Sequence, residues 1–396
     1  MSNCTQKILD LKELKVKKVQ KSLLALKIFV EMPVKEHVCP HCGKTTKQIH
    51  DYLSEREIKD MPIGLTKVKL VYKPRRYTCS CGKHFLENCE EILPRYKMTK
   101  RFINLIIEKT RELRSFKSIS KELGVSITTI IRIFDYINYT EKMFGKVICI
   151  DEFKGNLEKY KYQAVLVNPE MSKVIHIHKN RYKYDLHDWF KEIPKEKRYN
   201  VTYFICDMWD SYIQLAEHFF PKAKICVDRF HYTRYVTEAM NTVRKEVQNT
   251  VGKEYRKYMK HSRKLLLSHY EELTKIKKYD AQKQLYEMLN LSPKLTTAYY
   301  LLQSFYKVNE SKSRDEAKER LNNFYELVEK SNLEEFKKVV ETFKHYEKYI
   351  LNSFLTKYTN SYAEGMNTLI KTLKRIGYGY NNLNRFKNRI MHYQNA

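Results

Sequence analysis

Three acidic residues adjoin apolar segments of the chain, and their side chains could act together on a cation. Asp151 ends the run GKVICID, Asp207 ends VTYFICD, and Glu364 opens the amphipathic stretch EGMNTLIKTL. Carboxylates placed side by side raise one another's pKa unless a cation lies between them. Mg²⁺ or Mn²⁺ prefers oxygen ligands and keeps bound waters that can react. The three residue types therefore indicate a Mg²⁺ (or Mn²⁺) site.

Each of these acids also has a simpler explanation. Asp151 and Asp207 could be surface acids at strand ends, and Asp207 could cap a helix that starts near Ser211. Ser361-x-x-Glu364 satisfies the pattern of a helix capping box, which needs no catalysis. Against that explanation, Gly365 and Asn367 are poor helix formers for a first turn.

Four cysteines near the N-terminus have the spacing of a metal site. Cys39 and Cys42 form a C-x-x-C pair, and Cys79 and Cys81 form a tighter C-x-C pair. Two thiolate pairs beside Gly43 and Gly82 are typical of a structural tetrahedral Zn²⁺ site. His84 or Cys89 could replace Cys81 if the C-x-C turn cannot direct both sulfurs inward. Buried free thiols are the alternative, and a redox pair is disfavoured because no βαβ pattern surrounds it.

A helix-turn-helix pattern follows in SFKSISKELGVSITTIIRIFDYI. Gly124 would make the turn, and Ser126 would cap a second helix that runs through Ile133. The exposed early positions of such a second helix reach base edges in DNA. Here those positions are Ser126, Thr128, Thr129 and Arg132. Any helical hairpin with a glycine corner is the competing interpretation.

The end of the chain is strongly basic. After Glu364 there is no acidic residue, and the basic ones are Lys371, Lys374, Arg375, Arg385, Lys387 and Arg389. We expect this tail to follow the phosphates of a nucleic acid, since lysine and arginine neutralise them.

The composition agrees with a nucleic-acid partner. Lys plus Arg number 75 and Asp plus Glu 46 in 396 residues, a net charge of +29 that is too large for an ordinary metabolic enzyme. The hydrophobic fraction of 42% excludes a disordered basic tail. No apolar run is long enough for a membrane span, and the N-terminus lacks a signal-peptide core. We therefore expect a cytoplasmic, nucleoid-associated protein with no membrane partner, whose nine cysteines are thiols or metal ligands.

The elements around the acids predict a multidomain α+β chain. From residue 145 the pattern is strand, strand, strand, helix, strand, helix, strand, which matches a ribonuclease-H-like α/β core. In that core the first and fourth strands are adjacent, so Asp151 and Asp207 would face each other about 4.8 Å apart. The expected divisions are a zinc-binding β module (1–92), a helix-turn-helix domain (93–144), the first part of the core (145–231), an α-helical insertion (232–354), and the core's C-terminal helix with the basic tail (355–396).

Taken in order, these motifs resemble the ISL3 family of insertion-sequence transposases, from about Cys39 to Ile390. The most specific piece is AEGMN followed by KTLKRIGYGY, and DRFH is next. The resemblance implies DDE chemistry with Asp151, Asp207 and Glu364 as the acidic triad, and a supporting role for Asp228 and His231. The pair Cys79 and Cys81 departs from the family, since it is tighter than the second pair of many members.

Under this interpretation the triad would hold two divalent ions, by analogy with two-metal phosphoryl-transfer sites. The zinc module and helix-turn-helix would bind terminal inverted repeats in double-stranded DNA, and the joining of two ends suggests a homodimer. A non-catalytic DNA-binding regulator is the alternative, in which residues 1–140 suffice for binding. A ribonuclease-H-like nuclease that acts on RNA or structured DNA is a weaker third option.

Overall fold

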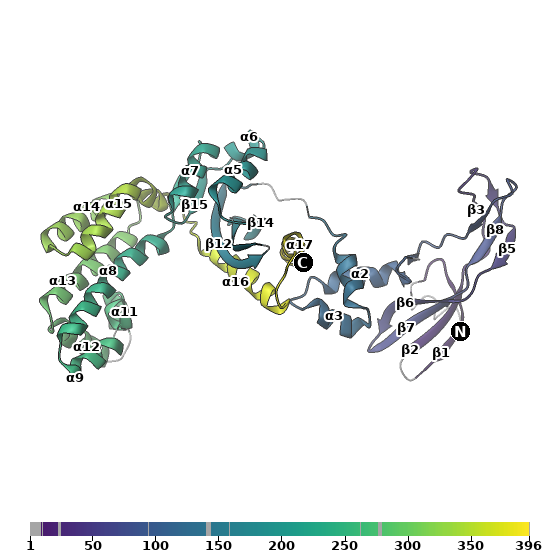
Figure 1. The fold of residues 1–396 in the computed structure, drawn as a ribbon, viewed down its shortest axis with the longest axis horizontal. Helices are drawn as coiled ribbons and strands as arrows, with labels where there is room; N and C mark the ends of the chain where they lie inside the picture. Colours follow the sequence, from purple (N-terminus) through teal and green to yellow (C-terminus); the bar gives the residue numbers. More distant parts are fainter. Residues whose placement is uncertain are drawn as a thin grey trace. The chain divides into compact units, whose positions relative to one another are not determined.

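The computed structural model describes residues 9, 11–22, 25–93, 95–139, 144–157, 159–261, 263–275 and 279–395. The chain divides into two compact units (Figure 1). The first comprises Met1–Tyr139, Leu373–Tyr380 and Asn384–Ala396, and the second comprises Thr140–Thr372 and Asn381–Leu383. Across the described part of the chain, every helix is too short or too polar to cross a lipid bilayer.

A six-stranded sheet forms the N-terminal part of the first unit, in the order β1-β2-β7-β6-β11-β10. Its strands are β1 (Lys15–Lys21), β2 (Ala25–Glu31), β6 (Arg56–Ile63), β7 (Thr66–Tyr72), β10 (Ile92–Leu93) and β11 (Met98–Thr99). Apolar and basic residues alternate in β7, so Val68 and Leu70 are buried while Lys67 is exposed. This alternation puts Val68 and Leu70 on the apolar face of the sheet, and Lys67 and Lys69 of β7 on the other face.

Short strands carry the two cysteine pairs. The hairpin of β3 (His37–Val38) and β4 (Thr45–Thr46) encloses the first pair. A three-stranded sheet in the order β5-β8-β9 encloses the second, with β5 at Ile49–Tyr52, β8 at Arg75–Thr78 and β9 at His84–Leu86. Each pair lies in a tight turn that closes on a glycine of positive φ, Gly43 at 75° and Gly82 at 78°.

Three helices complete the described N-terminal region: α2 (Lys100–Lys109), α3 (Phe116–Leu123) and α4 (Ile127–Phe134). The predicted turn is confirmed, because Gly124 ends α3 in the left-handed region with φ 63°. Ser126 caps α4 and accepts a hydrogen bond from the Thr129 amide, as its position before the helix predicted. Ile106, Ile119 and Ile130 are fully buried where the three helices meet.

The second unit is built on a five-stranded mixed sheet, in the order β14-β13-β12-β15-β16. The strands are β12 (Val147–Leu157), β13 (Tyr160–Asn168), β14 (Lys173–Ile177), β15 (Tyr203–Cys206) and β16 (Lys224–Val227). The first three pair antiparallel, whereas β12, β15 and β16 run parallel. The expected neighbourhood of the first and fourth strands is therefore present.

The two faces of this sheet have different covers. Ile148, Phe204 and Val227 point into a core with α5 (Lys183–Glu192) and α7 (Asp210–Phe219), and the short α6 (Lys195–Tyr199) lies beyond α5 in the chain. Cys149 and Cys226 point to the other face, where their thiols donate to the backbone carbonyls of Thr359 and Asn352. The segment just before the last helices therefore covers the face to which Asp151 also belongs, since residues two apart in a strand share a face.

Helices fill most of the chain between β16 and this covering segment. They are α8 (Arg229–Thr250), α9 (Lys253–His261), α10 (Arg263–Leu266), α11 (Tyr270–Lys275), α12 (Tyr279–Leu289), α13 (Pro293–Asn309), α14 (Arg314–Ser331) and α15 (Glu334–Asn352). Buried residues of α8, α13 and α15 such as Tyr232, Phe305 and Phe343 pack edge to face or tilted against one another. A 3-10 turn, Ser353–Leu355, leads on to α16 (Ser361–Ile376) and α17 (Leu383–Gln394).

The last helix differs from its expected place. The sequence assigned residues 355–396 to one core segment, but α17 packs with α2, α3 and α4 in the first unit. Asn388 donates to the Ile137 carbonyl at 3.0 Å, and His392 contacts the Ile107 carbonyl at 2.9 Å. The apolar face of α17, with Phe386 and Ile390 buried, explains this packing better than a solvated basic tail would.

Candidate active site and metal centres

Asp151 lies on β12, and Asp207 directly follows the adjacent parallel strand β15 in matching register. Cys149 of β12 pairs with Ile205 of β15, so positions two residues further along place the two aspartates side by side. Asp228 follows β16 in the same way, because Ile205 pairs with Cys226. The strand register thus brings three aspartates to one end of the sheet and onto one face.

Burial makes this acidic site electrostatically unfavourable without a cation. Asp151 is only 8% exposed, and burial together with the charge of Asp207 raises its pKa to about 7. The Glu152 amide donates to Asp151 Oδ1 at 2.6 Å. These features separate Asp151 from an ordinary acid at a strand end, which would be hydrated and fully ionised.

Side chains from other elements hold Asp207 and Asp228. His231, in the first turn of α8, has its Nε2 2.9 Å from Asp207 Oδ1; burial lowers the pKa of His231, but the hydrogen bond to Asp207 raises it overall. Asp228 caps α8, since its Oδ2 accepts from the Phe230 amide, while its Oδ1 accepts from the Asn360 amide at 2.9 Å. Two backbone amides thus engage Asp228 on both oxygens, unlike the other two aspartates.

The helix-capping explanations for Asp207 and Glu364 do not match the geometry. Helix α7 begins after Trp209 without a side-chain cap, so Asp207 does not cap it. Ser361 is the first residue of α16, and the Glu364 amide donates to the Asn360 carbonyl at 2.9 Å. Both acids are therefore available for another role.

Glu364 is exposed in the first turn of α16. Among the described residues, two groups of His, Cys, Asp or Glu have ligand atoms that all lie within 4.8 Å of one another. One is Cys39, Cys42, Cys79 and Cys81, and the other is His269, Glu271 and Glu310. Asp151, Asp207 and Glu364 are not such a group, so the carboxylate oxygens of the three acids do not all lie within 4.8 Å of one another.

The cysteine cluster has the geometry that Zn²⁺ requires. The Sγ atoms of Cys39 and Cys81 are 3.8 Å apart, and those of Cys42 and Cys79 are 3.5 Å apart. A tetrahedral ion with Zn–S bonds of about 2.3 Å would separate its sulfurs by about 3.8 Å. The Cys81 amide lowers the pKa of the Cys79 thiol to about 6; a backbone hydrogen bond at Lys44 lowers the pKa of the Cys42 thiol, but its contacts with the other thiols raise it overall to about 12. A metal that binds all four thiolates would therefore have to displace protons from the cluster. The four thiols thus fit a structural zinc.

Neither reserve ligand joins this cluster. His84 Nδ1 contacts the Thr78 hydroxyl at 3.0 Å, and its ring lies against His50. Cys89 is buried in the core of the six-stranded sheet with Ile58 and Ile92. The C-x-C turn directs both of its sulfurs toward the first pair, so Cys81 is the fourth member of the cluster.

Three stretches of the chain match known protein families. Residues 148–390 match a family described as transposase of the ISL3 group, 35–82 match the zinc-finger of transposase IS204/IS1001/IS1096/IS1165, and 94–138 match the helix-turn-helix domain of transposase family ISL3. The chain belongs to the ISL3 transposase family. It is also 26% identical over 366 residues to the "Transposase for insertion sequence element IS1001" of Bordetella parapertussis, covering 90% of this chain and 88% of that protein.

In this ISL3 transposase the expected base-reading positions run from the N-cap of α4 to its last turn. The hydroxyl of Ser126 lies 3.1 Å from that of Thr128 and 2.8 Å from that of Thr129. Arg132 is exposed, and its guanidinium lies over the Tyr96 ring, 4.9 Å from the centroid. Ser126, Thr128 and Thr129 thus present hydroxyl groups at the start of this short helix, and Arg132 presents its guanidinium from the last turn.

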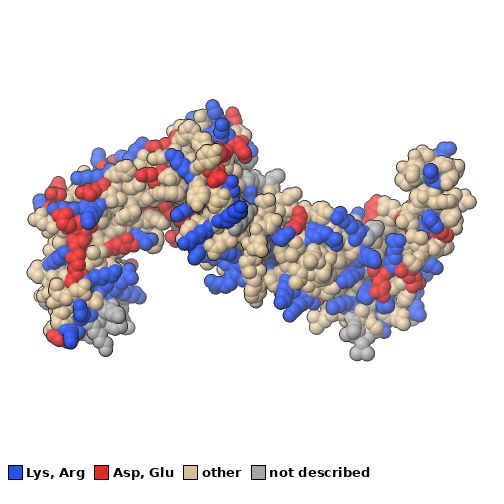
Figure 2. Space-filling model, viewed as in Figure 1, with Lys and Arg blue, Asp and Glu red and all other residues tan. Residues whose placement is uncertain are grey.

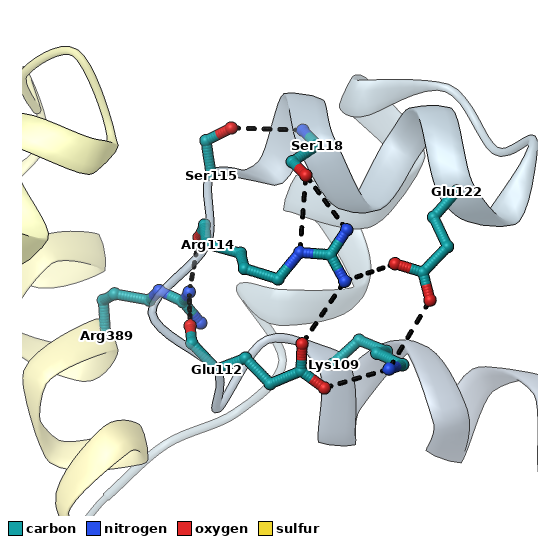
Figure 3. Close-up of polar contacts among 7 residues, drawn as sticks. All are labelled: Lys109, Glu112, Arg114, Ser115, Ser118, Glu122 and Arg389. Carbon is teal, nitrogen blue, oxygen red and sulfur yellow. Dashed lines mark hydrogen bonds and ion pairs between the residues drawn. The ribbon is translucent and has the colours of Figure 1, made fainter.

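The basic tail of the transposase separates into two kinds of residue. Lys371 and Arg375 are exposed on α16, and Lys374 is half-buried there. Arg389, by contrast, is 1% exposed and donates to the carbonyls of Glu112 and Arg114 (Figure 3). The expectation that Arg389 follows phosphates is wrong, because its guanidinium is used inside the protein.

Arg385 departs from the same expectation. Its guanidinium donates to both carboxylate oxygens of Asp135, at 2.8 and 2.7 Å. A bidentate pair of this kind fixes α17 to the end of α4. Arg385 therefore has an acidic partner within the protein, which a count of charges along the tail does not reveal.

The sequence analysis did not identify two buried asparagines that belong to the site of the transposase. Asn360 Nδ2 donates to Asp207 at 3.1 Å, and Asn367 Nδ2 donates to Asp151 at 2.7 Å. Asn367 is the asparagine of the AEGMN motif, so the motif was the available signal. Asn360 gave no signal in its spacing, and only its contact with Asp207 reveals it.

Proposed function

We propose that this ISL3 transposase cleaves and joins DNA at a DDE site made of Asp151, Asp207 and Glu364, in a core of ribonuclease-H-like fold. The observation that carries the proposal is the pair of aspartates on adjacent parallel strands, with the burial that raises the pKa of Asp151 to about 7. Strand order β14-β13-β12-β15-β16 supports the fold assignment. Helices α8 to α15 are then an insertion between the second and third acids.

The donor groups around the pair suit a hard divalent cation. The carboxylates of Asp151 and Asp207 lie at one end of the sheet, and each accepts a hydrogen bond from an asparagine amide nitrogen, of Asn367 and Asn360 respectively. Mg²⁺ or Mn²⁺ takes carboxylate oxygens as ligands, so the residues present fit such an ion. A bound divalent ion would supply Lewis-acid activation of water or a 3′-hydroxyl and would stabilise the leaving oxygen.

The side chains around the pair have separate tasks in this proposal. Asp151 and Asp207 bind the cation, and Glu364 completes the carboxylate set from α16. His231 fixes the orientation of the Asp207 carboxylate through its Nε2 contact. Asp228 positions the start of α16 and the start of α8, because it holds the Asn360 and Phe230 amides together.

DNA binding is proposed for the other modules. The zinc-bound cysteine module and the helix-turn-helix would bind the terminal inverted repeats, with Ser126, Thr128, Thr129 and Arg132 at the base edges. Lys371, Lys374 and Arg375 would contact phosphates of the end or of the target DNA. A complex of two element ends calls for a homodimer.

The test is a strand-cleavage and strand-transfer assay with Mg²⁺ on double-stranded DNA that carries the element ends. Loss of a metal ligand removes several kcal/mol of transition-state stabilisation. At about 1.4 kcal/mol per factor of ten, Asp151→Asn and Asp207→Asn should each lower cleavage by about 1,000-fold or more. Glu364→Gln should do the same, while all three variants still bind the ends.

Asp188→Asn is the matched control, since Asp188 is an exposed acid on α5 of the same unit. It should cleave like the unmodified chain. Equal activity of Asp151→Asn and the unmodified chain would refute the proposed triad. Full end binding by the whole chain with no cleavage by it would favour the regulator instead.

A further inference from the structure

Two asparagines connect the α16 segment to the two aspartates of the proposed cation site. Asn360, which immediately precedes α16, is 1% exposed, and Asn367, in its second turn, is 5% exposed. Each directs its amide nitrogen at a different aspartate, Asn360 at Asp207 and Asn367 at Asp151. The same segment is therefore attached to both strands, β12 and the end of β15.

The spacing of these residues places Glu364 between the two attachments. Positions 360, 364 and 367 are separated by four and three residues, so they lie along one face of a helix. The Asn360 carbonyl accepts the Glu364 amide, which shows that the helical hydrogen bonding already runs through this turn. The two asparagines consequently determine where the Glu364 carboxylate is held relative to the aspartate pair.

The asparagine side chains are also only half satisfied. Within the described residues, the Oδ1 atoms of Asn360 and Asn367 are buried and have no hydrogen-bond partner. A buried amide with an unpaired oxygen is a poor choice for stability alone, because burial of that oxygen is costly. Asn352, by comparison, is a buried amide of the same unit whose Nδ2 donates to the Ile225 carbonyl, away from the acids.

We propose that Asn360 and Asn367 are positioning residues of the cation site. Through their contacts with Asp207 and Asp151 they hold α16 in the position in which Glu364 can act as the third carboxylate. This inference rests on the proposed function, because it assigns these amides a role toward the proposed cation. It adds Asn360 and Asn367 to the site. It also explains the last residue of the AEGMN motif, Asn367, by its contact with Asp151.

The test is a Mn²⁺ titration of the full-length, zinc-loaded chain without DNA. The electron paramagnetic resonance signal of free Mn²⁺ measures how much of the ion is bound. The Mn²⁺ binding that is lost in Asp151→Asn is assigned to the proposed site. Binding that remains in this variant belongs to other groups, such as His269, Glu271 and Glu310. Asn360→Ala and Asn367→Ala should each raise the Mn²⁺ midpoint of that part by about 10- to 100-fold, the usual cost of losing a group that orients ligands. Asn352→Ala should leave the midpoint within about twofold.

A double-mutant cycle shows whether the asparagines act through Glu364. If they do, adding Asn367→Ala to Glu364→Gln should raise the midpoint little beyond that of Glu364→Gln alone. Thermal unfolding confirms that each variant is folded. Asn367→Ser, which is too short to reach Asp151, gives the same expected result where the alanine variant does not fold.

The outcomes separate this inference from the proposed function. If the unmodified chain shows no Mn²⁺ binding that depends on Asp151, the proposed function fails and the inference fails with it. If the unmodified chain binds but both asparagine variants match Asn352→Ala, the inference alone is overturned. Additive effects in the cycle also overturn it, because they mean that the asparagines do not work through Glu364.

Discussion

At the scale of single residues, Asp151 shows how burial prepares a carboxylate for a cation. Its environment keeps a proton near neutral pH, with a pKa raised from 3.8 to about 7 by burial and by Asp207. The folded chain thus holds a proton that the unfolded chain has already released. The contribution of Asp151 to stability therefore falls as the pH rises from about 4 to about 7 in the absence of a cation. His231 acts in the same direction, since its raised pKa makes its contact with Asp207 weaken as the pH rises through that pKa.

This proton makes cation binding depend on pH. Because a cation must displace the proton of Asp151, we expect the Mn²⁺ affinity to rise by up to about tenfold per pH unit below pH 7 and to level off above it. Mn²⁺ titrations of the full chain between pH 5.5 and 8 measure this slope. An affinity that stays constant from pH 5.5 to 7 would contradict the raised pKa.

At the scale of elements, α17 is part of the helix-turn-helix unit. Arg389 is buried between α17 and the loop before α3, over the Phe116 ring at 5.3 Å from the centroid. Figure 3 shows its guanidinium on the Glu112 and Arg114 carbonyls, beside the ion pairs that Arg114 and Lys109 make with Glu122. The last helix and the loop therefore share one hydrogen-bonded network.

Replacement of this arginine should weaken the unit. Asn388 and Arg385 also attach α17 to the N-terminal helices, but of these three side chains Arg389 is the buried one. We expect Arg389→Ala to lower the free energy of unfolding of this unit by about 2–4 kcal/mol, since it removes a buried side chain and leaves two part-buried carbonyls without their charged donor. Arg385→Ala, which removes a partly exposed ion pair, should cost about 1 kcal/mol or less. Hydrogen exchange of α2 to α4 in the full chain measures both, and equal protection in the two variants would refute the assigned role.

The stability of the two cysteine turns should depend on a bound zinc ion. Short strands such as β3 and β4 bury few apolar side chains, so a structural metal has to supply much of their folding energy. Zinc removal by a chelator, or Cys42→Ser, should unfold the β3–β4 hairpin and the β5-β8-β9 sheet, and leave β6, β7 and α2 to α4 folded. Zinc content and hydrogen exchange test this, and unchanged protection of β8 after full zinc loss would contradict it.

At the scale of the whole molecule, the net charge of +29 is spread over both units. On the face seen in Figure 2, lysine and arginine side chains occur over each unit, and acidic side chains are prominent among the long helices α13 to α15. A basic surface of this extent favours a polyanion and gives binding that weakens as salt displaces its contacts.

The salt dependence of DNA binding should report the phosphate contacts. Each contact contributes about −0.9 to the slope of log K against log salt concentration. Lys371→Ala with Arg375→Ala should therefore reduce the size of the slope by about 2. Lys195→Ala with Lys197→Ala on α6 removes the same charge and should leave the slope unchanged. Equal salt-dependence slopes for the two double variants would show that Lys371 and Arg375 do not contact the phosphates.

Much of the organisation was determined by the sequence alone, because it depends on spacing within a short stretch. The cysteine pairs, the turn at Gly124 with the cap at Ser126, and the alternation of strands and helices are local patterns. Strand order then made Asp151 and Asp207 neighbours, since the first and fourth strands of such a core pair in parallel.

Only the tertiary structure decided the partners of side chains that are far apart in the chain. Asn367 meets Asp151 across a separation of 216 residues, and Arg389 meets Glu112 across 277. Charge and periodicity describe a residue's own helix face, but they do not specify which distant surface that face covers. The burial of Arg389, the choice of Cys81 and the amides beside the acids depend on packing, which is a property of the folded chain.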